Sequence, residues 1–395
     1  MSSLPRRTFL AAGAGSTLAA ASAASAGAAS AAAAKAYLDP SGDRHVYFTG
    51  DGVPLKPKEW ASVLLQVTQE TEVDLDSYSV GGPVAELEKK FAEKLGKEAA
   101  IFFGSGTQAN QIAMRHVTAP DTKAIVPRES HYYADSVNCG PILSQLELIP
   151  MGKGRATFTF EEVKEEVEWN ASLRGNKPVG AVMIESPVRR KDGEVFDFGE
   201  MKKICAYARE KGIRTHLDGA RLFLSTDYTG VSMREYADQF DTLYISLHKY
   251  FNGGCGAIVA GPKKYIEPMV DTRRMFGGAL PKAWMYAAVI LHYMDGFEER
   301  YSSAVANTEK LWKTLDQHPR FRVERIPNGS NIVTLHVKGD AKRLGANLRK
   351  RGATISTGGP TSGDGWTSLS LRINETANRR PAEELASFFI EGLDA

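Results

Sequence analysis

Short apolar runs alternate with amphipathic helical patterns through the middle of the chain, and this alternation restricts the fold more than any other feature. The apolar runs predict strands at residues 99–103, 124–127, 146–150, 180–185, 214–218, 242–247 and 257–260. The segments between them predict helices at residues 107–117, 160–170, 198–211 and 231–238. This order is typical of an α/β fold, in which helices cover both faces of a mostly parallel sheet. We therefore expect a seven-stranded sheet with ligand-binding residues at the carboxyl ends of its strands.

The pattern changes after Gly278. A long helical stretch at 281–318 is interrupted near Gly296, and predicted strands (321–326, 332–337, 368–373) and helices (340–351, 381–392) follow it. This succession predicts a smaller C-terminal α+β domain. We expect a large domain over residues 76–285 and a small domain over 286–395. Residues 37–75 form an N-terminal segment, of which 45–75 would pack beside the small domain or reach a partner subunit.

The first 36 residues differ from the rest of the chain. Arg6-Arg7 precedes a weakly apolar run of Ala, Gly and Ser that ends in small residues at Ala34 and Ala36. This order is typical of a twin-arginine export signal with a cleavage site at small residues, and a disordered Ala-rich tail is the alternative. The run contains too little Leu and Ile for a membrane-spanning helix. We expect an exported protein, periplasmic or secreted, without stable membrane association.

Composition argues against several classes of protein. The 395 residues include 49 Lys and Arg against 47 Asp and Glu, a formal net charge of +2, so we do not expect a nucleic-acid-binding protein with a broad basic face. The three cysteines cannot form a disulfide framework. A low cysteine content is consistent with folding in a reducing cytoplasm before export, where a cofactor could be loaded.

A glycine-rich turn joins the predicted strand 99–103 to the helix that follows. Residues 104–109 read GSGTQA and match G-x-G-x-x-A, the turn of dinucleotide-binding folds. Only Glu129 could supply the acidic residue expected at the end of the next strand, so the match is weak. Small residues at the start of a helix also present backbone N–H groups to any phosphate. This motif alone leaves open an NAD-binding oxidoreductase and a tight turn without a ligand.

Three further strand ends carry residues suited to chemistry. His131 follows the strand at 124–127, and Asp218 ends the strand at 214–218. His216 shares a strand face with Asp218 and is interpreted as a core residue, because no third ligand accompanies the pair to form a metal site. Lys249 follows the strand at 242–247 and precedes a glycine-rich turn. A lone lysine is usually solvated, but a buried one has a lowered pKa and can form a Schiff base.

Together these elements resemble the fold-type I pyridoxal phosphate enzymes, and in detail the threonine aldolase and β-eliminating lyase family. A phosphate turn, a histidine, a strand-end aspartate and a strand-end lysine occur in that order. The segments similar to the family are residues 87–88, 106–110, 129–131, 216–223, 249 and 273–278. The resemblance covers residues 45–395 and is most specific over 75–280, which implies that the large domain binds pyridoxal phosphate.

The resemblance also implies a role for each site residue. The implied roles are phosphate binding by Ser105, Gly106 and Thr107, stacking on the pyridine ring by His131, pairing with the ring nitrogen by Asp218, and a Schiff base by Lys249. Arg221, beside the cofactor, and Arg372 would bind the substrate carboxylate, for which a guanidinium is suited. Arg273 would reach the phosphate of a neighbouring subunit, so we expect a homodimer or homotetramer with shared active sites.

One segment departs from the family pattern. Where the family usually has Glu-Asn-Thr-His-Asn, residues 185–190 of this chain read ESPVRR. The loop at 174–178 also lacks the histidine expected near the substrate hydroxyl. These differences leave open which base acts on that hydroxyl and which substrate side chain is preferred.

The resemblance implies a pyridoxal-phosphate-dependent lyase that cleaves the Cα–Cβ bond of a β-hydroxy amino acid to glycine and an aldehyde. β-Elimination on an amino acid is the first alternative, and a transferase is a lesser one. An NAD-binding oxidoreductase that uses the Gly104 turn would leave Asp218 and Lys249 without a role. An exported binding protein without catalytic activity is the last alternative.

Overall fold

The computed structural model describes residues 44–175 and 178–394. The predicted export signal at residues 1–36 lies outside the described residues, so its assignment stays a prediction. Among the helices of the described part, none is both long enough and apolar enough to cross a membrane.

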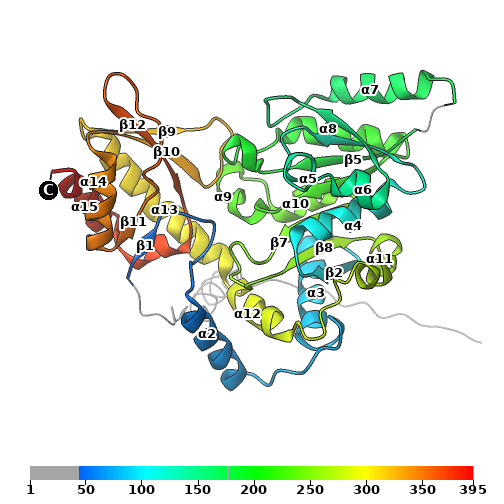
Figure 1. The fold of residues 1–395 in the computed structure, drawn as a ribbon, viewed down its shortest axis with the longest axis horizontal. Coiled ribbons are helices and arrows are strands. Elements are labelled where there is room, and N and C mark those ends of the chain that lie inside the picture. Colours follow the sequence, from blue (N-terminus) through cyan, green and yellow to red (C-terminus); the bar gives the residue numbers. More distant parts are fainter. Residues whose placement is uncertain (1–43, 176–177, 395) are drawn as a thin grey trace, which may run out of the picture. The chain divides into compact units, whose positions relative to one another are not determined.

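A seven-stranded sheet forms the centre of the large domain (Figure 1). Its strands lie in the order β2 (Ala99–Phe103), β8 (Ala257–Gly261), β7 (Thr242–Ser246), β6 (Arg214–Asp218), β5 (Val179–Glu185), β3 (Lys123–Pro127) and β4 (Glu147–Met151). Strand β8 pairs antiparallel with β2 and β7, and the remaining pairs are parallel. The predicted mostly parallel seven-stranded sheet is confirmed. The first and last residues of each strand lie within about one residue of the expected positions.

Helices cover both faces of this sheet because its strands bury side chains on both sides. Ile101 and Phe103 of β2 pack against α4 (Gly106–Thr118) and α11 (Lys263–Met275). Phe102 lies between them in the strand and faces the other side, where the covering helices are α3 (Gly82–Leu95), α8 (Phe198–Glu210) and α10 (Met233–Gln239). All three strand residues are buried, as expected for a sheet enclosed between two helical layers.

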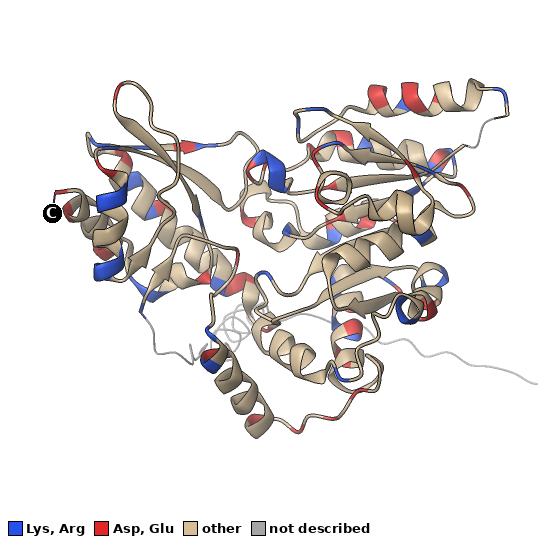
Figure 2. Cartoon of the chain, viewed as in Figure 1, with Lys and Arg blue, Asp and Glu red and all other residues tan. Residues whose placement is uncertain are grey.

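Short helices and one acidic helix complete the large domain. They are α5 (His131–Ala134), α6 (Cys139–Ser144), α7 (Phe160–Ser172) and α9 (Thr226–Thr229). Helix α7 begins with a capping box, in which the Thr159 hydroxyl accepts from the Glu162 backbone N–H and the Glu162 carboxylate accepts from the Thr159 N–H. Figure 2 shows several acidic residues along α7, whereas both charge signs are interspersed over many other elements.

The C-terminal part forms the predicted α+β unit. An antiparallel sheet in the order β12 (Trp366–Arg372), β10 (Ile332–Lys338) and β9 (Phe321–Arg325) packs with α13 (Phe297–Asp316), α14 (Ala341–Arg351) and α15 (Ala382–Asp394). Helix α12 (Trp284–Met294) precedes them. The expected break lies at Gly296, whose φ of 66° is left-handed and favours glycine.

The N-terminal segment packs with the C-terminal unit. Strand β1 (Val46–Tyr47) pairs in parallel with β11 (Ala353–Thr354). Val46 and Phe48 belong to the same core as Trp312 of α13. Helix α2 (Pro57–Glu70) then contacts α12. Residues 46 and 48 therefore pack with the small domain, whereas Val53 and Trp60 contact Asn252 after β7; contact of this segment with a partner subunit stays a prediction.

Candidate active site

A cavity of about 300 Å³ opens at the carboxyl ends of the central strands, where the sequence predicts ligand binding. Its lining comes from α4, α5 and the segments that follow β5, β6 and β7. The lining residues are Ser105, Gly106, Thr107, Asn110, His131, Glu185, Arg189, Asp218, Ala220, Arg221, Tyr244, His248 and Lys249. The three residues of the predicted phosphate turn therefore meet His131, Asp218, Arg221 and Lys249 in one cavity.

The start of helix α4 forms one end of the cavity. Ser105 caps the helix, because its hydroxyl accepts a 3.4 Å hydrogen bond from the Gln108 backbone N–H. A Cβ at position 106 would lie 2.0 Å from the Tyr244 hydroxyl, so only glycine lets the helix start so close to the sheet. The first backbone N–H groups of a helix have no intrahelical partner and attract anions. This turn can bind a phosphate.

Asp218, at the end of β6, has a fixed carboxylate. The Asn110 side-chain amide donates to Oδ2 at 2.6 Å, and the Ala220 backbone N–H donates to Oδ1 at 3.1 Å. The Asp218 side chain is 2% exposed. Since Asn110 must donate to the carboxylate, its carbonyl oxygen is the acceptor for the next residue in the network.

That next residue is His216, two positions before Asp218 in the same strand. Its Nε2 lies 3.0 Å from the Asn110 carbonyl oxygen and its Nδ1 lies 2.8 Å from the Thr242 hydroxyl. Burial lowers the pKa of His216 to about 3, so the ring is neutral. Nε2 therefore carries the proton and Nδ1 accepts from Thr242. His216 is the predicted core residue, and within the described part of the chain no cluster of three His, Cys, Asp or Glu side chains could hold a metal ion.

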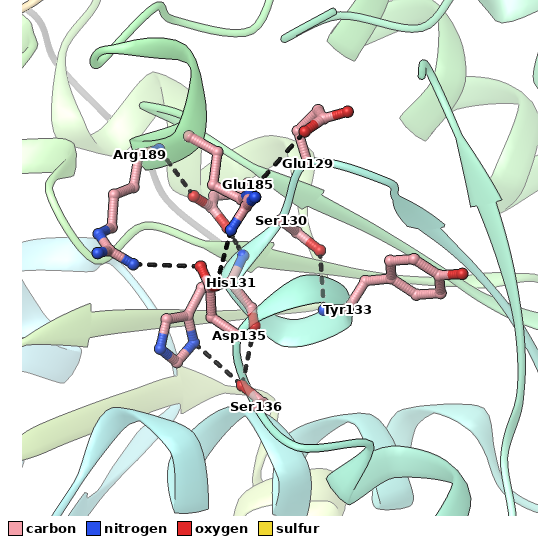
Figure 3. A network of polar contacts seen from close by, with 9 residues as sticks. Glu129, Ser130, His131, Tyr133, Asp135, Ser136, Glu185 and Arg189 are labelled. Carbon is pink, nitrogen blue, oxygen red and sulfur yellow. Dashed lines mark hydrogen bonds and ion pairs between the residues drawn. The ribbon is translucent and has the colours of Figure 1, made fainter. Parts of the chain in front are cut away.

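His131 begins α5 and is held by its backbone and by its ring. Its backbone N–H donates to the Glu185 carboxylate at 2.6 Å, and its Nδ1 lies 3.1 Å from the Ser136 hydroxyl (Figure 3). The Ser136 hydroxyl donates its proton to the His131 carbonyl at 2.9 Å. The Ser136 oxygen therefore accepts a hydrogen bond from Nδ1–H of His131. Burial lowers the pKa of His131, with a further contribution from the Lys249 charge. The neutral ring therefore keeps a lone pair on Nε2.

Glu185, at the end of β5, is a site residue that the sequence did not assign. Its two carboxylate oxygens accept from the backbone N–H groups of His131 and Arg189, at 2.6 and 3.0 Å. Burial, together with the negative charge of Asp218, raises the pKa of Glu185 to about 8. Its carboxyl group joins the segment after β5 to helix α5. Its strand-end position, like that of Asp218, is the sequence signal that could have identified it.

Lys249 follows β7. It is the one lysine among the described residues that line the cavity. Burial, and after it the charge of Arg221, lowers the pKa of Lys249 to about 8. An amine with a lowered pKa has a larger neutral fraction at physiological pH and can act as a nucleophile. A Cβ at position 52 would lie 2.1 Å from the Lys249 carbonyl oxygen, so Gly52 lets the N-terminal segment pack directly on the lysine backbone.

Arg221 and Arg372, predicted to bind a carboxylate, meet at Asp51. The Arg221 Nε donates to Asp51 at 2.7 Å, and an Arg372 terminal nitrogen lies 3.5 Å from the other carboxylate oxygen. Burial by itself raises the pKa of Asp51, but the charges of Arg221, Arg372 and Lys249 outweigh it and hold that pKa below its usual value. Arg221 lines the cavity, whereas Arg372, at the end of β12, is not among the described residues that line it. The sequence did not assign Asp51, which lies far along the chain from both arginines.

Arg273 is not among the residues that line the cavity in the described part of the chain. Its side chain is buried in α11 and donates to the backbone carbonyls of Phe102 and Ser79. These contacts fix the backbone of residues 76–80, where Tyr78 and Ser79 adopt left-handed conformations. The expected contact of Arg273 with a neighbouring subunit's phosphate stays a prediction.

Comparison with known proteins gives a consistent set of relatives. The family model described as "Beta-eliminating lyase" matches residues 62–338. The low-specificity L-threonine aldolase of Candida albicans is 30% identical over 211 residues, which cover 53% of this chain and 56% of that protein. The low specificity L-threonine aldolase of Saccharomyces cerevisiae is 27% identical over 79% of this chain and 82% of its own. A Listeria monocytogenes crystal structure assigned as an L-allo-threonine aldolase superposes with a TM-score of 0.73 at 25% identity, covering 90% of this chain and 97% of that one.

Proposed function

The chain belongs to the beta-eliminating lyase family, and on that basis we propose that it cleaves the Cα–Cβ bond of a β-hydroxy amino acid, releasing glycine and an aldehyde. It is a pyridoxal-phosphate-dependent lyase with the fold of the fold-type I enzymes. The observation that carries this function is the meeting of Lys249, Asp218 and the α4 N-terminus in one cavity.

The residues of the cavity fit pyridoxal phosphate. Ser105, Gly106 and Thr107 line the cavity at the start of α4, where backbone N–H groups and the two hydroxyls could bind a phosphate. Lys249, with its lowered pKa, is the amine for the aldehyde, and the fixed carboxylate of Asp218 suits a protonated ring nitrogen. When bound, the cofactor accepts the electron pair released at the substrate Cα.

Substrate binding is the role proposed for the arginines. Arg221 donates to Asp51 through Nε alone, so its terminal nitrogens can address a carboxylate in the cavity. Arg372 is one-third exposed at the same aspartate. Asp51 holds both guanidinium groups in place, and it thereby orients the α-carboxylate of the substrate.

Proton transfer from the β-hydroxyl is the role proposed for His131. Its Nε2 has a lone pair because the Ser136 hydroxyl fixes the proton on Nδ1. Its lowered pKa keeps the ring neutral at physiological pH and so able to accept a proton. When the hydroxyl proton leaves, the Cα–Cβ bond breaks, Cβ becomes the aldehyde carbon, and a proton delivered to Cα completes glycine.

Product analysis on the purified full chain tests this function. Incubation with threonine should give glycine and acetaldehyde in equal amounts, and Lys249→Ala should abolish both. Borohydride reduction followed by peptide mapping should label Lys249. Release of ammonia and a 2-oxo acid instead of glycine would indicate β-elimination and overturn the proposal.

Exposed apolar side chains near the start and end of the large domain indicate an interface between subunits. We propose a homo-oligomer whose interface includes Leu75, Tyr78, Val80 and Met275, which are each more than half exposed although apolar. The Arg274 guanidinium lies 5.7 Å from the Tyr78 ring centre, which places these two segments together.

Arg6-Arg7 and the Ala-rich run that follows support export by the twin-arginine route to the periplasm or the medium.

A further inference from the structure

Two consecutive arginines follow β5, and only one of them faces the cavity. Of the described residues that line the cavity, Arg189 is one and Arg190 is not. Both arginine side chains are about half exposed. They begin the short helical turn Arg189–Lys191, and the Arg189 backbone N–H is fixed on the buried carboxylate of Glu185. Arg189 therefore points from an anchored backbone toward the substrate space.

The position of Arg189 relative to His131 indicates which part of the substrate it would meet. Glu185 accepts from the backbone N–H of both residues, and the Arg189 guanidinium binds Asp135, which ends the His131 helix (Figure 3). If His131 receives the β-hydroxyl proton, the β-carbon lies beside it. A substituent on that carbon would then lie on the side of the cavity that Arg189 lines.

Most of the hydrogen-bonding capacity of Arg189 is not used by Asp135. One terminal nitrogen of Arg189 donates to Oδ2 of Asp135 at 3.1 Å, while Arg190 donates to Oδ1 of the same carboxylate at 2.8 Å. The Asp135 carboxylate thus binds both guanidinium groups, and Arg190 also lies 3.9 Å from the Glu129 carboxylate. A guanidinium has five N–H donors in a planar fork that matches a carboxylate or phosphate. Arg189 can hold Asp135 and still bind an anion of the substrate.

We propose that Arg189 selects β-hydroxy amino acids that carry an anionic group on the β-carbon, such as a second carboxylate. This inference rests on the proposed Cα–Cβ cleavage. For 3-hydroxyaspartate the balance is the same as for threonine: the hydroxyl proton leaves, the Cα–Cβ bond breaks, and Cα gains a proton. The products are glycine and glyoxylate in place of glycine and acetaldehyde.

Kinetics with two substrates and two matched variants test the proposal. The wild-type kcat/KM should be higher for 3-hydroxyaspartate than for threonine. Arg189→Gln should lower the value for 3-hydroxyaspartate roughly ten- to a hundredfold, the effect of one charge-assisted contact, and change the value for threonine less than about threefold. Arg190→Gln removes the neighbouring partner of Asp135 from outside the cavity and should leave both values nearly unchanged.

Binding of amino acids without a β-hydroxyl gives a second readout that needs no turnover. Aspartate should raise the melting temperature of the holoenzyme more than alanine does, and Arg189→Gln should remove the difference. A wild-type kcat/KM for threonine that equals that for 3-hydroxyaspartate would overturn the role assigned to Arg189, and so would equal effects of the two substitutions. Either result would leave the lyase function standing. Absence of glycine from both substrates would overturn the lyase function and the assignment with it.

Discussion

Asn110 donates a 2.6 Å hydrogen bond to the Asp218 carboxylate while its carbonyl oxygen accepts from Nε2 of His216. The amide therefore connects a charged group in the cavity to a neutral histidine in the core. Because His216 is buried and neutral, the network can orient the carboxylate without adding a competing positive charge. Orientation of Asp218 thus depends in part on His216, a core residue that is not among the described residues lining the cavity.

Asp218→Asn should lower turnover about a thousandfold, equivalent to about 4 kcal/mol in the barrier, because the charge that keeps a ring nitrogen protonated is lost. Asn110→Ala should cause a smaller loss, about ten- to a hundredfold, because the carboxylate keeps its charge and loses one donor. Steady-state kinetics at saturating cofactor measure both. Normal turnover of Asp218→Asn would exclude the assigned role.

Loading of the cofactor should depend on the protonation state of Lys249. Its pKa of about 8 means that the reactive neutral amine becomes more abundant as the pH rises through 8. The rate at which the cofactor-free protein gains its visible absorbance should increase tenfold per pH unit below that value and level off above it. A rate that is constant between pH 6 and 9 would contradict this assignment.

Asp51→Asn should weaken both the fold and substrate binding. The substitution removes a buried charge and leaves Arg221 with no carboxylate at its Nε, so we expect a loss of about 3 kcal/mol in the free energy of unfolding and a raised KM. The lowered pKa of Asp51 also predicts a pH effect in the wild type. Its stabilising contribution is present above the unfolded-state pKa and disappears as the pH falls through the lower folded-state value. Denaturant unfolding at several pH values measures this.

Arg273→Ala should reduce stability, because two buried backbone carbonyls lose their donor. Lys263→Ala, at an exposed position at the start of the same helix, is the control for a substitution in α11 that removes no buried contact. Sedimentation and cofactor titration of both variants separate the structural role of Arg273 from the predicted contact with a partner's phosphate. A variant that stays folded, becomes monomeric and keeps full activity would exclude a site shared between subunits.

Replacement of Arg6-Arg7 by Lys-Lys should retain the protein in the cytoplasm in a folded, active form. The two arginines precede a weakly apolar run, and the predicted catalytic domain begins well after it. Cell fractionation and an activity assay of each fraction measure the effect. Export of the Lys-Lys variant at the parental level would show that the segment is not a twin-arginine signal.

Sequence reasoning found the residues of the site that stand at strand ends. Ser105, His131, Asp218 and Lys249 each follow or end a strand, and strands of one sheet that run in the same direction have their carboxyl ends at the same edge. Asp51 could not be found in this way, because its partner Arg372 lies 321 residues further along the chain. Contacts across that distance leave no periodic pattern in the sequence.

Helix α11 and strand β1 were not predicted from the sequence, and each has a physical reason. Helix α11 contains Pro268, and proline inside a segment argues against a helix, although the packing of Ile266 and Met269 against the sheet overrides that preference. Strand β1 has two residues and forms only because β11 lies beside it. Both elements depend on tertiary packing more than on local preference.

Pairing of Val46 with Ala353 has a consequence for the order of events during synthesis. The ribosome synthesises residue 46 long before residue 353, so β1 can pair with β11 only after most of the chain has been made. Until then Asp51 cannot engage Arg372, and the segment that packs through Gly52 onto the Lys249 backbone has no anchor at its far end. Prematurely terminated chains would therefore lack the contact between Asp51 and Arg372. The segment that packs on the Lys249 backbone is thus anchored at both ends only in a finished polypeptide.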